Sequence, residues 1–139
     1  MEEFIIGETT KIFSKAIKRY AKLDFQNQLD VSLLLNLETN EDGERSVAYQ
    51  ICNHHQPVKK IKIMDVLGVL IDLKGYSLLV PPQIKKIIEN FEVEMNSKNC
   101  EVCVYLDRED ENEVMYFLYK DGSLVRKFEL HEVLKLELA

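Results

Sequence analysis

The chain has 139 residues, of which 46% are apolar and 30% are charged, an ordinary composition for one globular domain. Folding at this length buries roughly two-thirds of the unfolded surface, so a single core over residues 1–139 can form without disulfides or metal. The net charge is −6, and residues 71–139 hold 14 acidic against 9 basic groups, whereas residues 1–70 hold 10 and 9. This balance disfavours a nucleic-acid partner, because that affinity comes from clustered Lys and Arg.

Export and membrane insertion are also disfavoured. Glu2 and Glu3 stand where a signal peptide needs basic residues, and the apolar run after them is too short to span a bilayer. The three cysteines cannot all pair with one another, and nothing in their spacing indicates an oxidising compartment. We therefore expect a cytoplasmic protein. Its 14 Lys against 4 Arg are typical of an AT-rich genome, as in many bacteria and phages.

The first half of the chain reads as one helix followed by three strands. Residues 9–23 carry apolar groups at the spacing of one helix face, and residues 31–37 alternate as a strand does. An acidic turn over 39–44 leads into a second strand at 45–52, and a third strand is expected at 58–63. The sequence then predicts a short buried helix over 65–73.

The second half repeats this order. A helix is predicted over 82–96, where Pro82 suits the first turn, and a strand over 102–106. A second acidic turn, 107–112, joins it to strands at 113–120 and 124–130. The last segment, 132–138, fits either a short helix or an extended tail. Of the two connectors between second and third strands, only Asp121-Gly122 has the signature of a tight turn.

These two halves align at a spacing of 67 residues. Residues 60–67 correspond to 127–134, and Val47, Tyr49 and Ile51 correspond to Val114, Tyr116 and Leu118. We predict an α+β fold, an antiparallel sheet covered by helices, built from two tandem helix-strand-strand-strand-(short helix) repeats, 1–75 and 78–139. The linker between them is short and apolar, so both repeats should share one core.

No motif for catalysis, metal binding or nucleotide binding is present. Cys100 and Cys103 resemble half of a zinc site, but within a strand residues three apart point to opposite faces. A Ser or Cys nucleophile would have only His54, His55 and His131 as imidazole bases, and the strained Gly-x-Ser-x-Gly turn is missing. His131 is interpreted as a partly buried residue at a strand end. We expect no cofactor and no metal, and the balance favours a protein that is not an enzyme.

The two repeats differ on the face of the sheet that points away from the helices. In the first repeat this face should carry Ala48, Gln50 and Cys52. In the second it should carry larger apolar groups, namely Cys103, Tyr105, Met115, Phe117, Tyr119 and Val125. Because a wet sheet face normally shows polar residues, this face should be covered, either by the rest of the chain or by another molecule.

We therefore predict a non-catalytic protein-binding module, of the inhibitor, immunity or chaperone-like adaptor type, that docks on a partner with a basic surface. Aromatic residues would supply contact area, and neighbouring carboxylates would supply a polar rim. The predicted interface comprises Tyr105, Asp107, Glu109, Asp110, Glu111, Met115, Phe117 and Tyr119. The same face could serve self-association. The alternative is a small-molecule-binding protein or enzyme with a pocket between the repeats near Cys52, His54 and His55.

Overall fold

The structure is a computed structural model of the chain, and it describes residues 2–24, 28–62 and 80–133. The first half contains helix α1 (Glu2–Asp24), a short 3-10 helix η1 (Gln28–Asp30) and strands β1 (Val31–Thr39), β2 (Arg45–Asn53) and β3 (Gln56–Ile61). The second half contains helix α3 (Val80–Met95), strands β4 (Cys100–Leu106), β5 (Val114–Lys120) and β6 (Ser123–Phe128), and helix α4 (Leu130–Val133). The predicted short helix over 65–73 lies outside the described residues.

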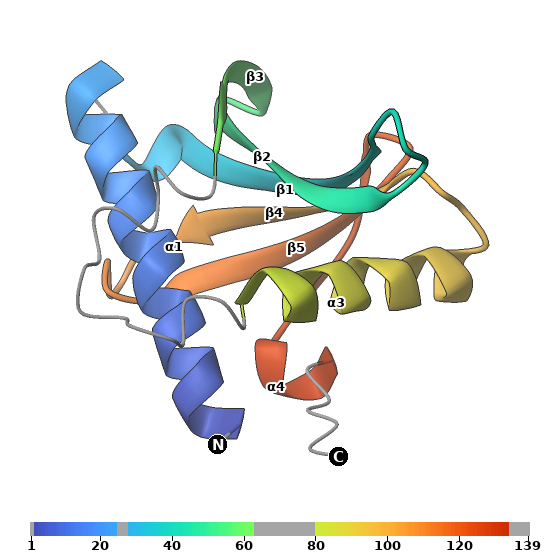
Figure 1. Cartoon of the computed structure of the whole chain (residues 1–139). Helices are drawn as coiled ribbons and strands as arrows, with labels where there is room; N and C mark the ends of the chain where they lie inside the picture. The colour runs from blue at the N-terminus through green and yellow to red at the C-terminus, as the bar shows by residue number, and fades with distance from the viewer. Residues whose placement is uncertain (1, 25–27, 63–79, 134–139) are drawn as a thin grey trace.

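The six strands form one antiparallel sheet in the order β3-β2-β1-β4-β5-β6. Each half contributes three consecutive strands, and β1 pairs with β4 where the halves meet, from Ser32↔Tyr105 to Leu35↔Val102. The α+β class and the antiparallel sheet are confirmed. In Figure 1 helices α3 and α4 lie below the sheet, while β3 curls upward on the opposite side.

The core lies between the sheet and the two long helices. Because α1 and α3 are one-sided, each buries its apolar stripe against the sheet. Phe13 and Ile17 of α1 and Ile88 of α3 are fully buried in the same cluster as Leu33 of β1 and Val104 of β4. One hydrophobic cluster therefore contains residues from both halves of the chain.

Some positions that are 67 residues apart in the two halves share a sheet register. Tyr49 pairs with Ile61 and Tyr116 pairs with Phe128, and these pairs are 67 residues apart. A bulge interrupts the register after Ile51 in one half and after Leu118 in the other, again at that spacing. The residues at these positions are all buried in the core, namely Tyr49, Ile51 and Ile61 in the first half and Tyr116, Leu118 and Phe128 in the second.

Three sequence expectations need correction. Helix α1 begins at Glu2 rather than near residue 9, and its early residue Ile6 packs partly buried against the core. The connector at His54-His55, which lacks a tight-turn signature, is nonetheless a tight turn in which both residues have positive φ. His131 is exposed on the short helix α4 rather than partly buried at a strand end.

Candidate functional site

The most unusual surface is the face of the sheet opposite α1 and α3, which we call the outer face. Across β4 and β5 it pairs Tyr105 with Met115, Cys103 with Phe117 and Glu101 with Tyr119. None of these six residues belongs to the helix-side core. The four predicted interface residues with large side chains, Tyr105, Met115, Phe117 and Tyr119, therefore lie together, and each is half-buried.

The part of the outer face that comes from the first half includes small, buried side chains. Ser32 is 1% exposed, Cys52 2% and Ala48 6%. In the second half the corresponding area is built from aromatic rings and Met115. The difference between the two halves that the sequence predicts is thus present on the predicted face.

One depression, which we call the apolar hollow, has a volume of about 350 Å³. Its floor comes from β4 and β5, and Leu124 closes it from β6 although this side chain is 57% exposed. Leu124 takes this place because the bulge after Leu118 pairs Tyr119 with Leu124 and leaves Val125 out of the register. The residues that line it include His55, Tyr105, Met115, Phe117, Tyr119 and Leu124.

The second depression, the carboxylate hollow, also measures about 350 Å³ and lies across β1, β2 and β4. Glu101 supplies its only carboxylate, and no Lys or Arg lines it among the described residues. His55 and Tyr119 line both hollows. The residues that line the carboxylate hollow include Leu34, Cys52, His55, Glu101, Cys103 and Tyr119.

The wall between the hollows is the turn that joins β2 to β3. His54 has φ 51° and His55 has φ 66°, values in the left-handed backbone region that residues other than Gly rarely adopt. The equivalent turn of the second half, 67 residues later, is Asp121-Gly122 with φ 52° and 80°. His55 therefore occupies a position where the other half uses glycine, at a cost on the order of 1 kcal/mol or more.

Contacts with the outer face hold the His55 ring in place. The Tyr105 hydroxyl lies 2.6 Å from His55 Nδ1, and the Tyr119 hydroxyl lies 3.5 Å from the same atom. The His55 and Tyr105 ring centroids are 5.5 Å apart. The turn itself is anchored because the backbone N–H of His54 donates to the carbonyl of Asp30 at 3.0 Å. The imidazole thus bridges the two halves of the sheet.

Burial suppresses ionisation across this surface. Desolvation raises the pKa of Cys103 to about 12 and that of Tyr105 to about 12, and it also raises the pKa of Cys52. Desolvation likewise raises the pKa of Glu101. The thiols and phenols are therefore neutral at pH 7, and they offer contact area and hydrogen bonds rather than a nucleophile.

The acidic residues predicted for the interface lie in the loop that joins two strands of the outer face. Asp107, Glu109, Asp110 and Glu111 belong to the β4–β5 loop and do not line either hollow. This loop is fastened to α1, because Ser14 Oγ donates to the Glu111 carbonyl and Lys18 donates to the Asn112 side chain. Arg108 is the charged residue of this loop that reaches the apolar hollow.

The cysteines do not gather into a metal site. Cys100 lies in the helix-side core and Cys103 on the outer face, as expected for residues three apart in a strand. All three cysteines are buried and unpaired. In the described part of the chain no group of three or more His, Cys, Asp or Glu side chains could hold a metal ion.

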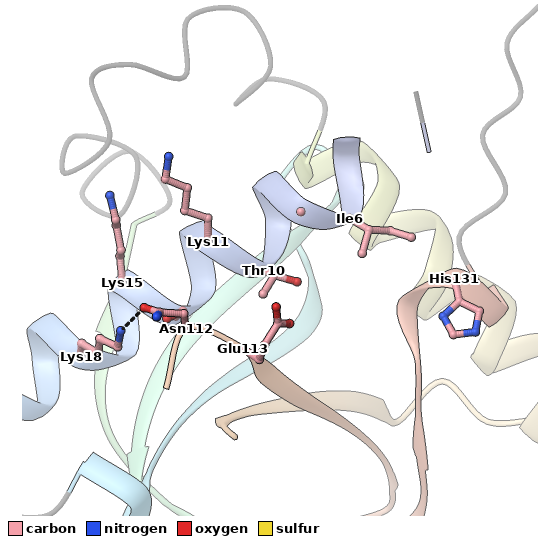
Figure 2. A pocket seen from close by; sticks show the side chains of 10 residues that line it. Ile6, Thr10, Lys11, Lys15, Lys18, Asn112, Glu113 and His131 are labelled. Carbon is pink, nitrogen blue, oxygen red and sulfur yellow. Dashed lines mark hydrogen bonds between the residues drawn. The ribbon is translucent and has the colours of Figure 1, made fainter. Parts of the chain in front are cut away.

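A larger cavity, of about 680 Å³, lies on the helix side between α1 and the β4–β5 loop. Figure 2 shows that Lys11 and Lys15 point away from Thr10 and Glu113, while Lys18 bonds Asn112. The lysines are thus solvated or occupied in fastening the loop. The polar side chains around this cavity fasten the loop to the helix, and its charged groups do not point toward a common position.

Comparison with known proteins gives no identification, since no protein family, curated protein or solved structure matches this chain. None of the helices described is long and apolar enough to cross a membrane.

Sequence reasoning missed two elements of the outer face. It did not place His55 over Tyr105, although the spacing of 67 aligns His54-His55 with Asp121-Gly122 and so indicates a tight turn. It also overlooked Glu101, which stands two residues before Cys103 and four before Tyr105 and therefore lies on the same face of the strand.

Proposed function

We propose that this protein is a non-catalytic binding module that docks on a protein partner through the outer face. The observation that carries the proposal is the group formed by Tyr105, Met115, Phe117 and Tyr119, half-buried on the sheet face opposite α1 and α3. Aromatic residues and Met are enriched at interface centres, because they supply large contact areas.

The partner is expected to present a basic surface, because the chain carries a net charge of −6. A cytoplasmic location fits this proposal, since the three cysteines are unpaired. Self-association through the same face is the competing use, and it would give a dimer whose mass depends on concentration.

The experiment is affinity capture of the tagged protein from lysate of its source, with wild type and Phe117→Asp compared. Leu124→Asp serves as a second variant, because this side chain is already 57% exposed and its replacement should not disturb folding. Val93→Asp is the matched control, since Val93 is 81% exposed on α3 and lines neither hollow.

A stoichiometric protein that wild type and Val93→Asp retain, and that both outer-face variants lose, supports the proposal. Retention of the same protein by well-folded Leu124→Asp and Phe117→Asp contradicts it. Mass measurement on dilution separates a partner from a second copy of the chain.

The second candidate function is binding or turnover of a small molecule. It is favoured by the two hollows of about 350 Å³ that meet at His55, within reach of His54 and Cys52. His54→Ala and His55→Ala should then weaken ligand binding with little loss of stability.

We also infer that the two halves are repeats of one unit. Three features support this: the bulges, the tight turns and the buried Tyr positions all recur at a spacing of 67 residues. Separate expression of residues 1–79 and 80–139 tests whether each half retains strand content.

A further inference from the structure

Among the residues that the structure describes, none forms an ion pair or a hydrogen bond with the carboxylate of Glu101. Glu101 is half-buried on β4. Burial raises its pKa, which reflects poor solvation of its charged form. A buried carboxylate normally has a compensating cation or hydrogen-bond donors.

No Lys or Arg among the described residues lines the carboxylate hollow. Its walls include the Cys52 and Cys103 thiols, which are neutral because burial raises their pKa, and the side chain of Leu34. Tyr119 lies directly opposite Glu101 in the β4–β5 register. A carboxylate beside an aromatic ring is a favourable setting for an ammonium or guanidinium group, which gains both an ion pair and a cation–π contact.

The neighbouring apolar hollow suits a different group. Met115, Phe117 and Leu124 provide an apolar lining, to which Asp30 and Arg108 add one charge of each sign. His55 and Tyr119 form the wall shared with the carboxylate hollow. One ligand can therefore place an apolar side chain in the first hollow and a cation in the second. A polypeptide segment provides both groups at a fixed spacing, whereas a free amine provides only the cation.

We propose that the outer face recognises a segment of a partner protein that carries a Lys or Arg side chain next to a large apolar side chain. The cation pairs with Glu101 and the apolar residue fills the hollow over Met115 and Phe117. This inference rests on the proposed function and adds to it the chemistry of the partner. It also relocates the charge complementarity from the acidic β4–β5 loop to a single carboxylate.

The test is selection of peptides from a random phage-displayed library on the immobilised full chain. Selected peptides are then titrated against wild type, Glu101→Gln, Leu124→Asp and the control Glu94→Gln, whose side chain is exposed on α3. Methylguanidine and butylamine are titrated separately as free cations.

We expect enrichment of peptides that combine Lys or Arg with a nearby large apolar residue. Glu101→Gln should weaken them at least tenfold, which corresponds to about 1.4 kcal/mol, while Glu94→Gln should leave the affinity within twofold. Leu124→Asp should abolish the binding, and the affinity for wild type should fall as salt is added.

Several outcomes overturn the inference and are distinguishable from failure of the proposed function. Peptides without a basic residue, or basic peptides that bind Glu101→Gln as well as wild type, remove Glu101 as the anchor. If Leu124→Asp still abolishes that binding, the outer face remains the interface. No enrichment at all rejects recognition of a short segment and leaves the capture experiment to decide the proposed function. Free cations that bind as tightly as the best peptide would place a small-molecule amine in the hollow instead.

Discussion

The Tyr105 hydroxyl lies 2.6 Å from Nδ1 of His55, a residue 50 positions earlier in the chain. This contact connects the β2–β3 turn to β4, and it places an imidazole across the junction of the two three-stranded halves. His55 reaches this place only through a backbone conformation that favours glycine, with φ 66°. Strained residues of this kind cluster at functional sites, so the position of His55 is consistent with the proposed use of the outer face.

The double variant His54→Asn, His55→Gly should be more stable than the wild type. Asn-Gly suits a two-residue turn with positive φ at both positions, so the strain at both residues is relieved. Loss of the Tyr105 contact offsets part of this gain, since a hydrogen bond contributes about 1 kcal/mol. We expect a net gain of about 1 kcal/mol in the free energy of unfolding, measured by urea denaturation. A loss of stability would mean that the ring contacts outweigh the strain.

Breaking the ion pair between Arg45 and Glu92 should destabilise the fold. The guanidinium binds both carboxylate oxygens, at 2.7 and 2.6 Å, and joins β2 to α3 while the Glu92 side chain is only 2% exposed. Arg45→Met leaves a buried carboxylate unpaired, at a cost of about 2–3 kcal/mol after allowance for the partly exposed Arg45. The paired variant Arg45→Met, Glu92→Met should recover most of this loss in the same urea measurement. Equal stability of the single variant and the wild type would show that the pair contributes nothing.

Replacing Tyr49 by Phe should be neutral or stabilising. The Tyr49 side chain is 2% exposed, and its hydroxyl is buried without a hydrogen-bond partner in the described part of the structure. Removal of an unsatisfied hydroxyl gains about 1 kcal/mol. The midpoint of urea unfolding at pH 7 provides the comparison, and a clear loss of stability would point to an unobserved partner for the hydroxyl.

Stability should fall as the pH rises above about 10. Burial raises the pKa of Tyr49 and Tyr116, and raises that of Tyr105 to about 12. Above the ordinary tyrosine pKa of about 10, the unfolded chain releases phenolic protons that the folded chain retains, so unfolding becomes more favourable with rising pH. Thermal unfolding between pH 8 and 11.5 measures this slope, and Tyr49→Phe should reduce it. An unchanged slope in that variant would assign the effect to the other tyrosines.

The cysteines of the native protein should react slowly with thiol reagents. All three are buried, and desolvation raises the pKa of each, with Cys103 at about 12. At pH 8 very little of the Cys103 thiol is then ionised, and the thiolate is the reactive form. Titration with Ellman's reagent should find almost no reactive thiol in the native protein and three in urea. Rapid labelling of the native chain would show that the outer face opens.

Much of the fold follows from periodicity alone. The sequence pattern is clear for the helix face of Phe13 and Ile17 and for the strand alternation of Leu33 and Leu35. These positions all face one continuous core. The pairing of β1 with β4 is not encoded locally, since Leu34 and Cys103 stand 69 positions apart and no turn joins them. The extension of α1 to Glu2 is equally hard to predict from a segment that contains Gly7.

The candidate site was predictable only in part. Met115 and Phe117 break the apolar-in, polar-out alternation of an exposed strand, and this signal is visible in the sequence. The position of His55 depends on a turn geometry that histidine rarely adopts, so residue preferences point away from it. Leu124 replaces the expected Val125 because a bulge shifts the register, and bulges leave little trace in composition.

The short ladder between β1 and β4 has a further consequence for the order in which the chain assembles. Within each half, every strand pairs with its neighbour in sequence across a short turn, and such local hairpins form within microseconds. The β1–β4 ladder must instead close a long loop before its contacts contribute, and it is the step that α1 reinforces by packing on both β1 and β4. Substitutions along this ladder should therefore slow folding, whereas those in the outer hairpins should mainly speed unfolding.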